Sequence, residues 1–106
     1  MVTPANDLDV VRRLAARQRI CEFFQPVLTE LRRHGLDTDD LREIIVDELG
    51  EIHCFRSRPT ERYYPTTVSD YYSYWIDVRG ARMYIKLLIS GQRLVITSFK
   101  KDNRYA

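Results

Sequence analysis

Long hydrophobic runs are missing from this 106-residue chain: no stretch approaches the roughly 18 apolar residues of a membrane-spanning helix. Its first residues, MVTPANDLDVV, have neither the basic start nor the apolar segment of a secretion signal, so we expect a cytoplasmic protein with no membrane partner. Cysteine is scarce as well. Cys21 and Cys54 form no CxxC pair and no zinc-spaced Cys/His set, and we expect two buried free thiols.

The motifs of several enzyme classes are also missing. The chain contains no GxGxxG, GxxxxGK[ST], HExxH or GxSxG, so nucleotide, zinc-protease and serine-hydrolase chemistry have no motif behind them. Asp37, Asp39 and Asp40 stand together, but capping and the dipole of a helix start explain these acids. His34 and His53 fit structural roles better than catalytic ones. We therefore expect no metal site and no cofactor.

What the sequence does contain is an uneven distribution of charge. Residues 1–50 carry seven arginines against ten acids, a net charge of −3, whereas residues 51–106 carry ten lysines and arginines against five acids, a net charge of +5. All seven tyrosines and the single tryptophan also lie in the second part. Basic residues interleaved with aromatics suit phosphate attraction and base stacking. The alternative is that strands simply favour aromatics.

Apolar residues recur at helical spacing in three segments of the first part of the chain. The first segment runs from an N-cap at Asn6 or Asp7 to about Gln18, the second from Phe24 to a stop at Gly35, and the third from a cap at Asp37 or Thr38 to Gly50. After that the period changes to two, which predicts strands at residues 52–56, 71–78, 83–90 and 94–100. Pro59 and Pro65 predict a loop over residues 57–67.

The expected strands are joined by short turns at residues 79–80 and 90–92, which is typical of an antiparallel meander. We therefore predict a single α+β domain over residues 1–106, with N-terminal helices packed on one face of a twisted antiparallel β-sheet and the other face free to bind.

Alternation along the last two strands predicts which side chains share a face. On one strand the core face holds Met83, Ile85, Leu87 and Ile89, and the other face holds Tyr84, Lys86, Leu88 and Ser90. On the next, Leu94, Ile96, Ser98 and Lys100 share one face, opposite to Val95, Thr97 and Phe99. Lys86 and Lys100 then approach each other across the hairpin, which favours an anionic ligand; the alternative is that these lysines only keep a sheet edge soluble.

Four segments together resemble a known family: HGLDTDDLREIIVDELG, TTVSDYYSYWIDV, ARMYIKLLIS and RLVITSFKKD. In order and spacing they are similar to the motility quorum-sensing regulator (MqsR) toxins, of the RelE-like group of bacterial ribonucleases, over about residues 34–102. The most specific matches are Trp75 with Asp77 and Val78, the strand around Tyr84, and the terminal residues 98–100.

The resemblance implies a RelE-like fold and a toxin of a type II toxin–antitoxin system. Such a protein is a metal-independent mRNA endoribonuclease (mRNA interferase) that inhibits translation and growth, with mRNA and a cognate antitoxin as partners and the ribosome as a possible third. Cleavage without a metal needs proton transfer at the 2′- and 5′-oxygens and cations on the phosphate, tasks that tyrosine, lysine and arginine can share.

By motif match, the resemblance assigns catalytic roles to Tyr84 and Lys100. Arg56 takes the place of the family's other lysine, with Arg58 and Arg62 as the alternatives, and the sheet pattern adds Lys86 as a phosphate-holding group. The family's glutamine is Ile76 here, for which Tyr74 is the expected substitute. The residues expected to bind RNA around these groups are Arg58, Arg62, Tyr74 and Arg82.

Two other functions stay open at this point. One is a non-catalytic RNA-binding or regulatory domain on the same fold. The other is a protein-interaction module that uses the tyrosine-rich segment 63–75 as an exposed recognition surface.

Overall fold

Three α-helices lead the chain, in a computed structural model that describes residues 2–76 and 81–105. They are α1 (Leu8–Ala15), α2 (Gln25–Arg33) and α3 (Thr38–Asp47). The Asp7 carboxylate caps α1 by accepting a hydrogen bond from the Asp9 amide, and Asp37 and Asp40 form a reciprocal capping box at α3. The predicted helix starts are therefore confirmed. No helix within the described ranges is long and apolar enough to span a bilayer.

The helix ends follow backbone geometry. Gly35, at φ 71°, follows α2 in the left-handed region that glycine adopts easily, so the predicted stop is confirmed. The prediction that the first helix reaches Gln18 was wrong, since α1 ends at Ala15. The reason is that the Leu14 carbonyl accepts the amide of Arg17, three residues on, and the tighter bond ends the α-helix.

The strands form one five-stranded sheet, in the order β1-β5-β4-β3-β2, and β1 lies between α1 and α2 in the chain. Its strands are β1 (Cys21–Phe23), β2 (Cys54–Pro59), β3 (Val68–Ile76), β4 (Ala81–Ser90) and β5 (Arg93–Lys101). Strands β2 to β5 form the expected antiparallel meander, and Gly91, at φ 61°, sits in the β4–β5 turn. The short β1 joins β5 in parallel, which makes the sheet mixed. The predicted turn at residues 79–80 lies outside the described residues.

The segment before β3 differs from the prediction. Glu51–His53 forms a 3-10 turn rather than strand, and β2 then continues to Pro59, through residues predicted to be loop. Proline is tolerated there because β2 is an edge strand, where a missing N–H breaks no ladder. Strand β3 also begins earlier than expected, at Val68.

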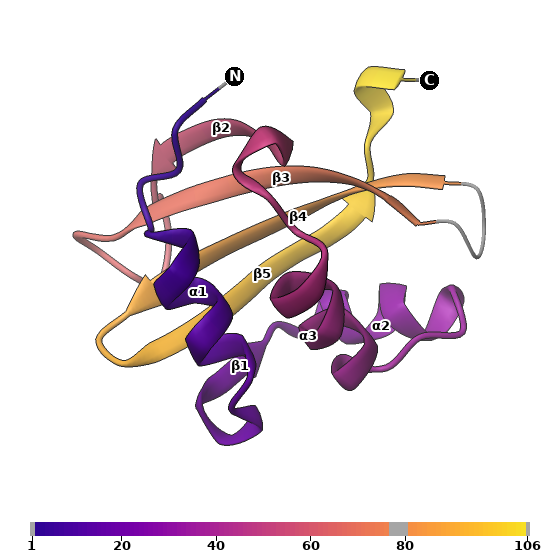
Figure 1. Ribbon diagram of the computed structural model, residues 1–106, viewed down its shortest axis with the longest axis horizontal. Coiled ribbons are helices and arrows are strands. Elements are labelled where there is room, and N and C mark those ends of the chain that lie inside the picture. The colour runs from indigo at the N-terminus through magenta and orange to yellow at the C-terminus, as the bar shows by residue number, and fades with distance from the viewer. Residues whose placement is uncertain (1, 77–80, 106) are drawn as a thin grey trace.

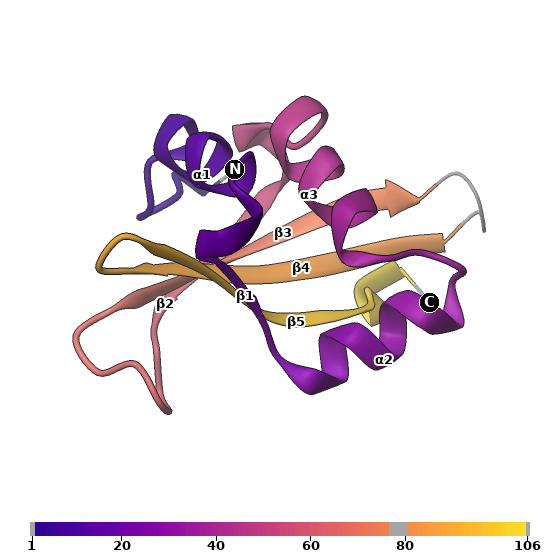
Figure 2. The same ribbon diagram turned by 90° about the horizontal axis from the view of Figure 1, so that it is seen from below.

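The helices and the sheet form two layers around one core. Helices α1 and α3 cover one face of the sheet, whereas α2 packs along β5 at its edge (Figures 1 and 2). All three helices contribute to the core, which is made of Leu8, Val11, Ala15, Val27, Leu31, Leu41, Ile45, Leu49, Cys54, Tyr72, Met83, Ile85, Leu87, Leu94, Ile96 and Phe99. This arrangement confirms the predicted α+β class with helices against a sheet.

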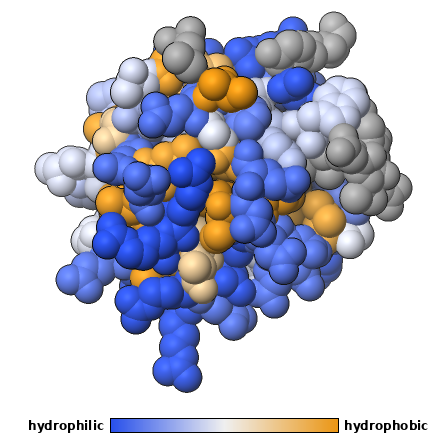
Figure 3. Space-filling view, viewed as in Figure 1, coloured by the Kyte–Doolittle hydropathy of each residue, from blue (hydrophilic) through white to orange (hydrophobic). Residues whose placement is uncertain are grey.

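The two faces of the sheet differ in whether helices cover them. Seen from the helix side, the surface is mostly hydrophilic, with hydrophobic residues showing in patches between hydrophilic ones (Figure 3). The opposite side of the sheet, here called the open face, carries no α1 or α3, and the β2–β3 loop extends on that side (Figure 2). The open face is therefore where strand side chains are free to meet a ligand.

Candidate functional site

Strand register brings four predicted catalytic residues together on the open face. Tyr84 on β4 lies directly opposite Lys100 on β5. Lys86, two residues along β4 on the same face, lies opposite Tyr71 of β3, and Tyr71 is in turn opposite Arg56 of β2. The group Arg56, Tyr84, Lys86 and Lys100 thus comes from three strands, β2, β4 and β5, with Tyr71 of β3 lying between Arg56 and Lys86.

A β-bulge on β5 decides which of its side chains join this group. Lys86 pairs with Ser98, but the next residue of β4 pairs with Ile96, so Thr97 is an extra residue. The prediction that Leu94, Ile96, Ser98 and Lys100 share a face was therefore wrong. Phe99 is 1% exposed and lies in the core with Ile96, while Ser98 and Lys100 turn to the open face.

Three aromatic rings lie at the centre of the open face; we call Phe55, Tyr71 and Tyr84 the aromatic cluster. Tyr71 and Tyr84 are stacked at 29° with centroids 6.1 Å apart, and Phe55 lies 6.0 Å from Tyr71 and 6.5 Å from Tyr84. A second bulge, between Cys54 and Arg56, shifts the register of β2 beside Phe55. The sequence predicted a catalytic role for Tyr84, placed Tyr71 only in the possible recognition segment 63–75, and gave Phe55 no role.

Cations lie over these rings. The Lys86 Nζ is 5.2 Å from the centroid of Tyr71, and the guanidinium carbon of Arg56 is 5.5 Å from the same ring. The guanidinium carbon of Arg104 lies 3.5 Å from the centroid of Phe55. Each contact is within cation–π range. Sequence reasoning missed Arg104, because it lies beyond the last strand in a three-residue turn with no periodicity.

Asp102 positions Arg104. Its carboxylate is 3% exposed and accepts hydrogen bonds from Ser73 Oγ at 2.6 Å and from Arg104 Nε and Nη2 at 3.1 and 3.0 Å. The bonds from Arg104, and then that from Ser73, lower the pKa of Asp102 to about 2, against the desolvation that raises it. Asp102 is therefore ionised at neutral pH and holds Arg104 in place.

Charge on the open face is largely uncompensated. Most ion pairs of the described residues lie within helices or at a helix end: Arg12–Asp9, Arg33–Glu30, His34–Glu30 and Arg42–Asp39. Across residues 2–76 and 81–105, Arg56, Lys86 and Lys100 form no ion pair, whereas Arg104 is paired with Asp102. Clustered cations without partners attract anions.

The structure separates the four residues expected to bind RNA. Arg58 lies opposite Ser69 on the open-face side of β2, and Arg62 is exposed in the β2–β3 loop. Arg82 lies opposite Trp75, with its guanidinium carbon 5.7 Å from that ring. These three remain beside the aromatic cluster or at its margins.

Tyr74 does not join them. It lies opposite Met83 and packs partly buried against the core, with its ring 5.5 Å from that of His53. Tyr74 therefore lies on the core side of the sheet, away from the aromatic cluster, and its expected role as a substitute for the family's glutamine stays a prediction. The side chain of Ile76, at the glutamine position itself, lies outside the described residues.

The β2–β3 loop crosses the open face. Tyr64 Oη donates a hydrogen bond to Glu22 of β1, at the opposite edge of the sheet, and this bond raises the pKa of Tyr64. Tyr63 meets Phe24 edge-on at 5.9 Å. We call residues 60–67 the strap. The tyrosine-rich segment 63–75 therefore forms no single exposed surface, because Tyr64 is tethered and Tyr72 is buried.

The histidines and cysteines have structural surroundings. His53 Nδ1 accepts a 2.8 Å hydrogen bond from the Gly50 amide, and burial lowers the pKa of this histidine. Cys54 is a buried free thiol and Cys21 a half-buried one; burial raises the pKa of both, which disfavours the nucleophilic thiolate. Within the described ranges, no three His, Cys, Asp or Glu side chains gather where they could hold a metal ion.

Comparison with known protein families and with curated protein sequences finds no match for this chain. The arrangement of cations and aromatic rings on the open face is therefore what bears on function.

Proposed function

We propose that the protein is a metal-independent endoribonuclease that binds single-stranded RNA across the open face. The observation that carries the proposal is that Arg56, Lys86 and Lys100, which form no ion pair among the described residues, surround the aromatic cluster, with Tyr84 directly opposite Lys100. Single-stranded nucleic acid is bound by this combination, because cations follow the phosphates while bases stack on aromatic rings.

The chemistry follows from the chain's own groups. The 2′-oxygen of RNA attacks the adjacent phosphorus, so the 2′-O–P bond forms as the P–O5′ bond breaks. The proton of the 2′-hydroxyl leaves and the departing 5′-oxygen gains one, giving a 2′,3′-cyclic phosphate and a free 5′-hydroxyl. Lys86, Lys100 and Arg56 hold the phosphate as negative charge builds, and Tyr84 exchanges a proton with the reacting oxygens.

The biological setting that we propose comes from the family resemblance of the sequence. A protein similar to MqsR toxins would cut mRNA in the cytoplasm, alone or on the ribosome, and inhibit translation until a cognate antitoxin neutralises it. The open face is where such an antitoxin would block RNA.

A cleavage assay tests the proposal. Purified protein is incubated with a mixed-sequence RNA in EDTA, and the new ends are mapped. We expect discrete cleavage with cyclic-phosphate ends, reduced by about 100-fold or more in Lys100→Ala and Tyr84→Phe, the size of effect typical when one transition-state-stabilising group is lost. The matched control is Arg13→Ala, which removes an exposed cation from α1 on the helix side.

The outcomes separate the candidate functions. Equal cleavage by all variants would indicate a contaminating nuclease and contradict the site. RNA that is bound but stays intact would favour the non-catalytic RNA-binding function on the same face.

A further inference from the structure

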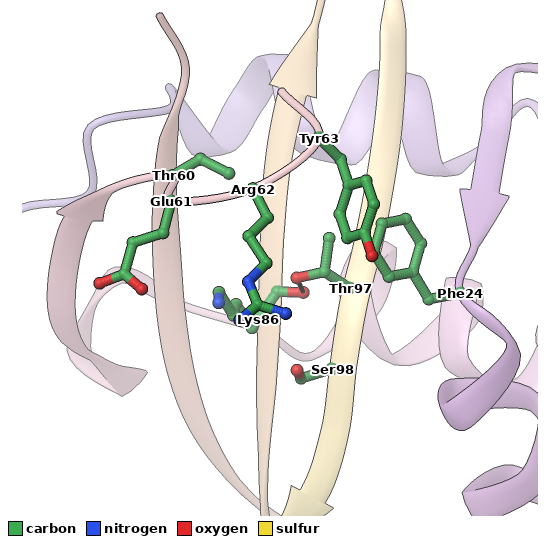
Figure 4. A pocket seen from close by; sticks show the side chains of 8 residues that line it. All are labelled: Phe24, Thr60, Glu61, Arg62, Tyr63, Lys86, Thr97 and Ser98. Carbon is green, nitrogen blue, oxygen red and sulfur yellow. Dashed lines mark hydrogen bonds between the residues drawn. The ribbon is translucent and has the colours of Figure 1, made fainter. Parts of the chain in front are cut away.

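A hollow of about 300 Å³ lies between the strap and strands β4 and β5. Its lining comes from three parts of the chain: Phe24 before α2, Thr60, Glu61, Arg62 and Tyr63 of the strap, and Lys86, Thr97 and Ser98 of the sheet (Figure 4). Hollows of this size are at the lower end of small-ligand sites. We call it the strap pocket.

The polar groups of the strap pocket suit an anion. Arg62 reaches from the strap toward Lys86, and the hydroxyls of Thr97 and Ser98 lie alongside (Figure 4). The one acid of the lining, Glu61, forms no ion pair with Arg62 or Lys86 among the described residues. Two like charges that face a shared hollow repel each other, and neither has an ion-pair partner within the described residues. A bound phosphate would relieve that repulsion.

An aromatic group completes the strap pocket. The Tyr63 side chain is 77% exposed, although its ring touches Phe24 edge-on at 5.9 Å. The next residue, Tyr64, holds the strap in place through its hydrogen bond to Glu22. The strap therefore presents a ring at a defined position with its face available for stacking, and a base can use it without sequence-specific hydrogen bonds.

We infer that the strap pocket is a second RNA subsite, which binds the nucleotide adjacent to the one that is cleaved. Arg62 and Lys86 hold its phosphate and Tyr63 stacks on its base. Lys86 connects the two sites, since its Nζ also lies 5.2 Å from the Tyr71 ring of the aromatic cluster. This inference rests on the proposed function, because it takes the open face as the path of an RNA chain.

The test is an NMR titration of the ¹⁵N-labelled full chain, at low salt, with adenosine 3′,5′-bisphosphate and, separately, inorganic phosphate. We expect saturable amide shifts at the strap and at Lys86, Thr97 and Ser98. Arg62→Ala should weaken the bisphosphate by about tenfold, the equivalent of one charge-assisted contact. Tyr63→Ala should weaken the bisphosphate but leave phosphate binding unchanged. The matched control Arg13→Ala, checked with the others for an unaltered melting temperature, should bind like the original protein.

Two results would overturn the subsite, and they differ in what they say of the proposed function. Bisphosphate shifts confined to Arg56, Tyr84 and Lys100, insensitive to Arg62→Ala, would remove the strap pocket and leave the proposed nuclease site in place. No shifts anywhere, together with no binding or cleavage of a mixed-sequence RNA, would remove both.

Discussion

At the scale of single residues, Tyr72 places a polar group in the core that has no hydrogen-bond partner among the described residues. Tyr72 is fully buried, and its hydroxyl has no hydrogen-bond partner in the described structure. Burial, together with the nearby charge of Asp70, raises the pKa of this tyrosine well above its usual value. The hydroxyl is therefore a cost to folding rather than a stabilising contact.

We expect Tyr72→Phe to keep the free energy of unfolding or raise it by about 1 kcal/mol, since the change removes an unsatisfied buried group. Urea unfolding monitored by circular dichroism measures this. The comparison variant Tyr72→Ala should lose about 3–5 kcal/mol through the cavity it leaves. A loss above about 1 kcal/mol in Tyr72→Phe would show that the hydroxyl has a partner after all.

Asp102 links stability to pH. Its pKa falls from 3.8 to about 2 on folding, mainly through the hydrogen bonds from Arg104. A carboxylate whose pKa is lowered in the folded state adds stability that is present above about pH 4 and lost as the pH falls toward 2. The shift corresponds to about 2 kcal/mol at neutral pH.

We therefore expect Asp102→Asn to have a lower free energy of unfolding than the original protein at pH 7, and this difference to vanish as the pH approaches 2. Urea unfolding between pH 2 and 7 measures the difference. The control is Asp9→Asn, whose carboxylate is 89% exposed in its pair with Arg12 and should change little at any pH. A difference that stays constant with pH would contradict an electrostatic role for Asp102.

At the scale of elements, the β-bulges decide which side chains of a strand face the core and which face the open side. Periodicity predicted that residues 94–100 form a strand and that residues 83–90 alternate between core and open face, and both are confirmed. It missed the extra residue on β5, because a bulge is set by how two strands pair, which neither strand records alone. Without it, Phe99 would turn away from the core.

Deleting Thr97 tests whether the extra residue on β5 is what keeps Phe99 in the core. The deletion would force either Phe99 out of the core or Lys100 away from Tyr84, so we expect a loss of several kcal/mol in the free energy of unfolding. Denaturant titration measures it. Thr97→Ala keeps the residue count and should fold with nearly full stability; similar stability of the deletion variant would show that β5 can pair in another register.

At the scale of the whole molecule, the ion pairs of the described residues lie mostly on the helices, whereas Arg56, Lys86 and Lys100 on the open face form none there. The net charge of +2 conceals this division, which arises because most acids lie in the first fifty residues. One arginine in each of α1, α2 and α3 pairs with an acid about one turn away: Arg12, Arg33 and Arg42. The sheet cations face the opposite side, and a polyanion there would release its counterions on binding.

RNA affinity should therefore fall steeply with salt. With roughly four phosphate contacts, the slope of log affinity against log salt concentration is expected near −3, measured by fluorescence anisotropy with a labelled mixed-sequence RNA. Lys100→Ala should make the slope shallower by about 0.7, the share of one contact on a single strand. Arg13→Ala should leave it unchanged, and an equal effect of both substitutions would argue for non-specific charge attraction over the whole surface.

The sequence by itself determined the helices, most of the meander, the α+β class and the basic, aromatic character of the second part. These properties depend on local capping and on side-chain period, which neighbouring residues encode. Only the tertiary structure decided that Arg104 lies on the Phe55 ring and that Tyr74 lies on the core side of the sheet. It also decided that the strap is tied to β1 by the hydrogen bond from Tyr64 to Glu22. Each depends on strand register and on contacts between residues far apart in the chain, which no local pattern contains.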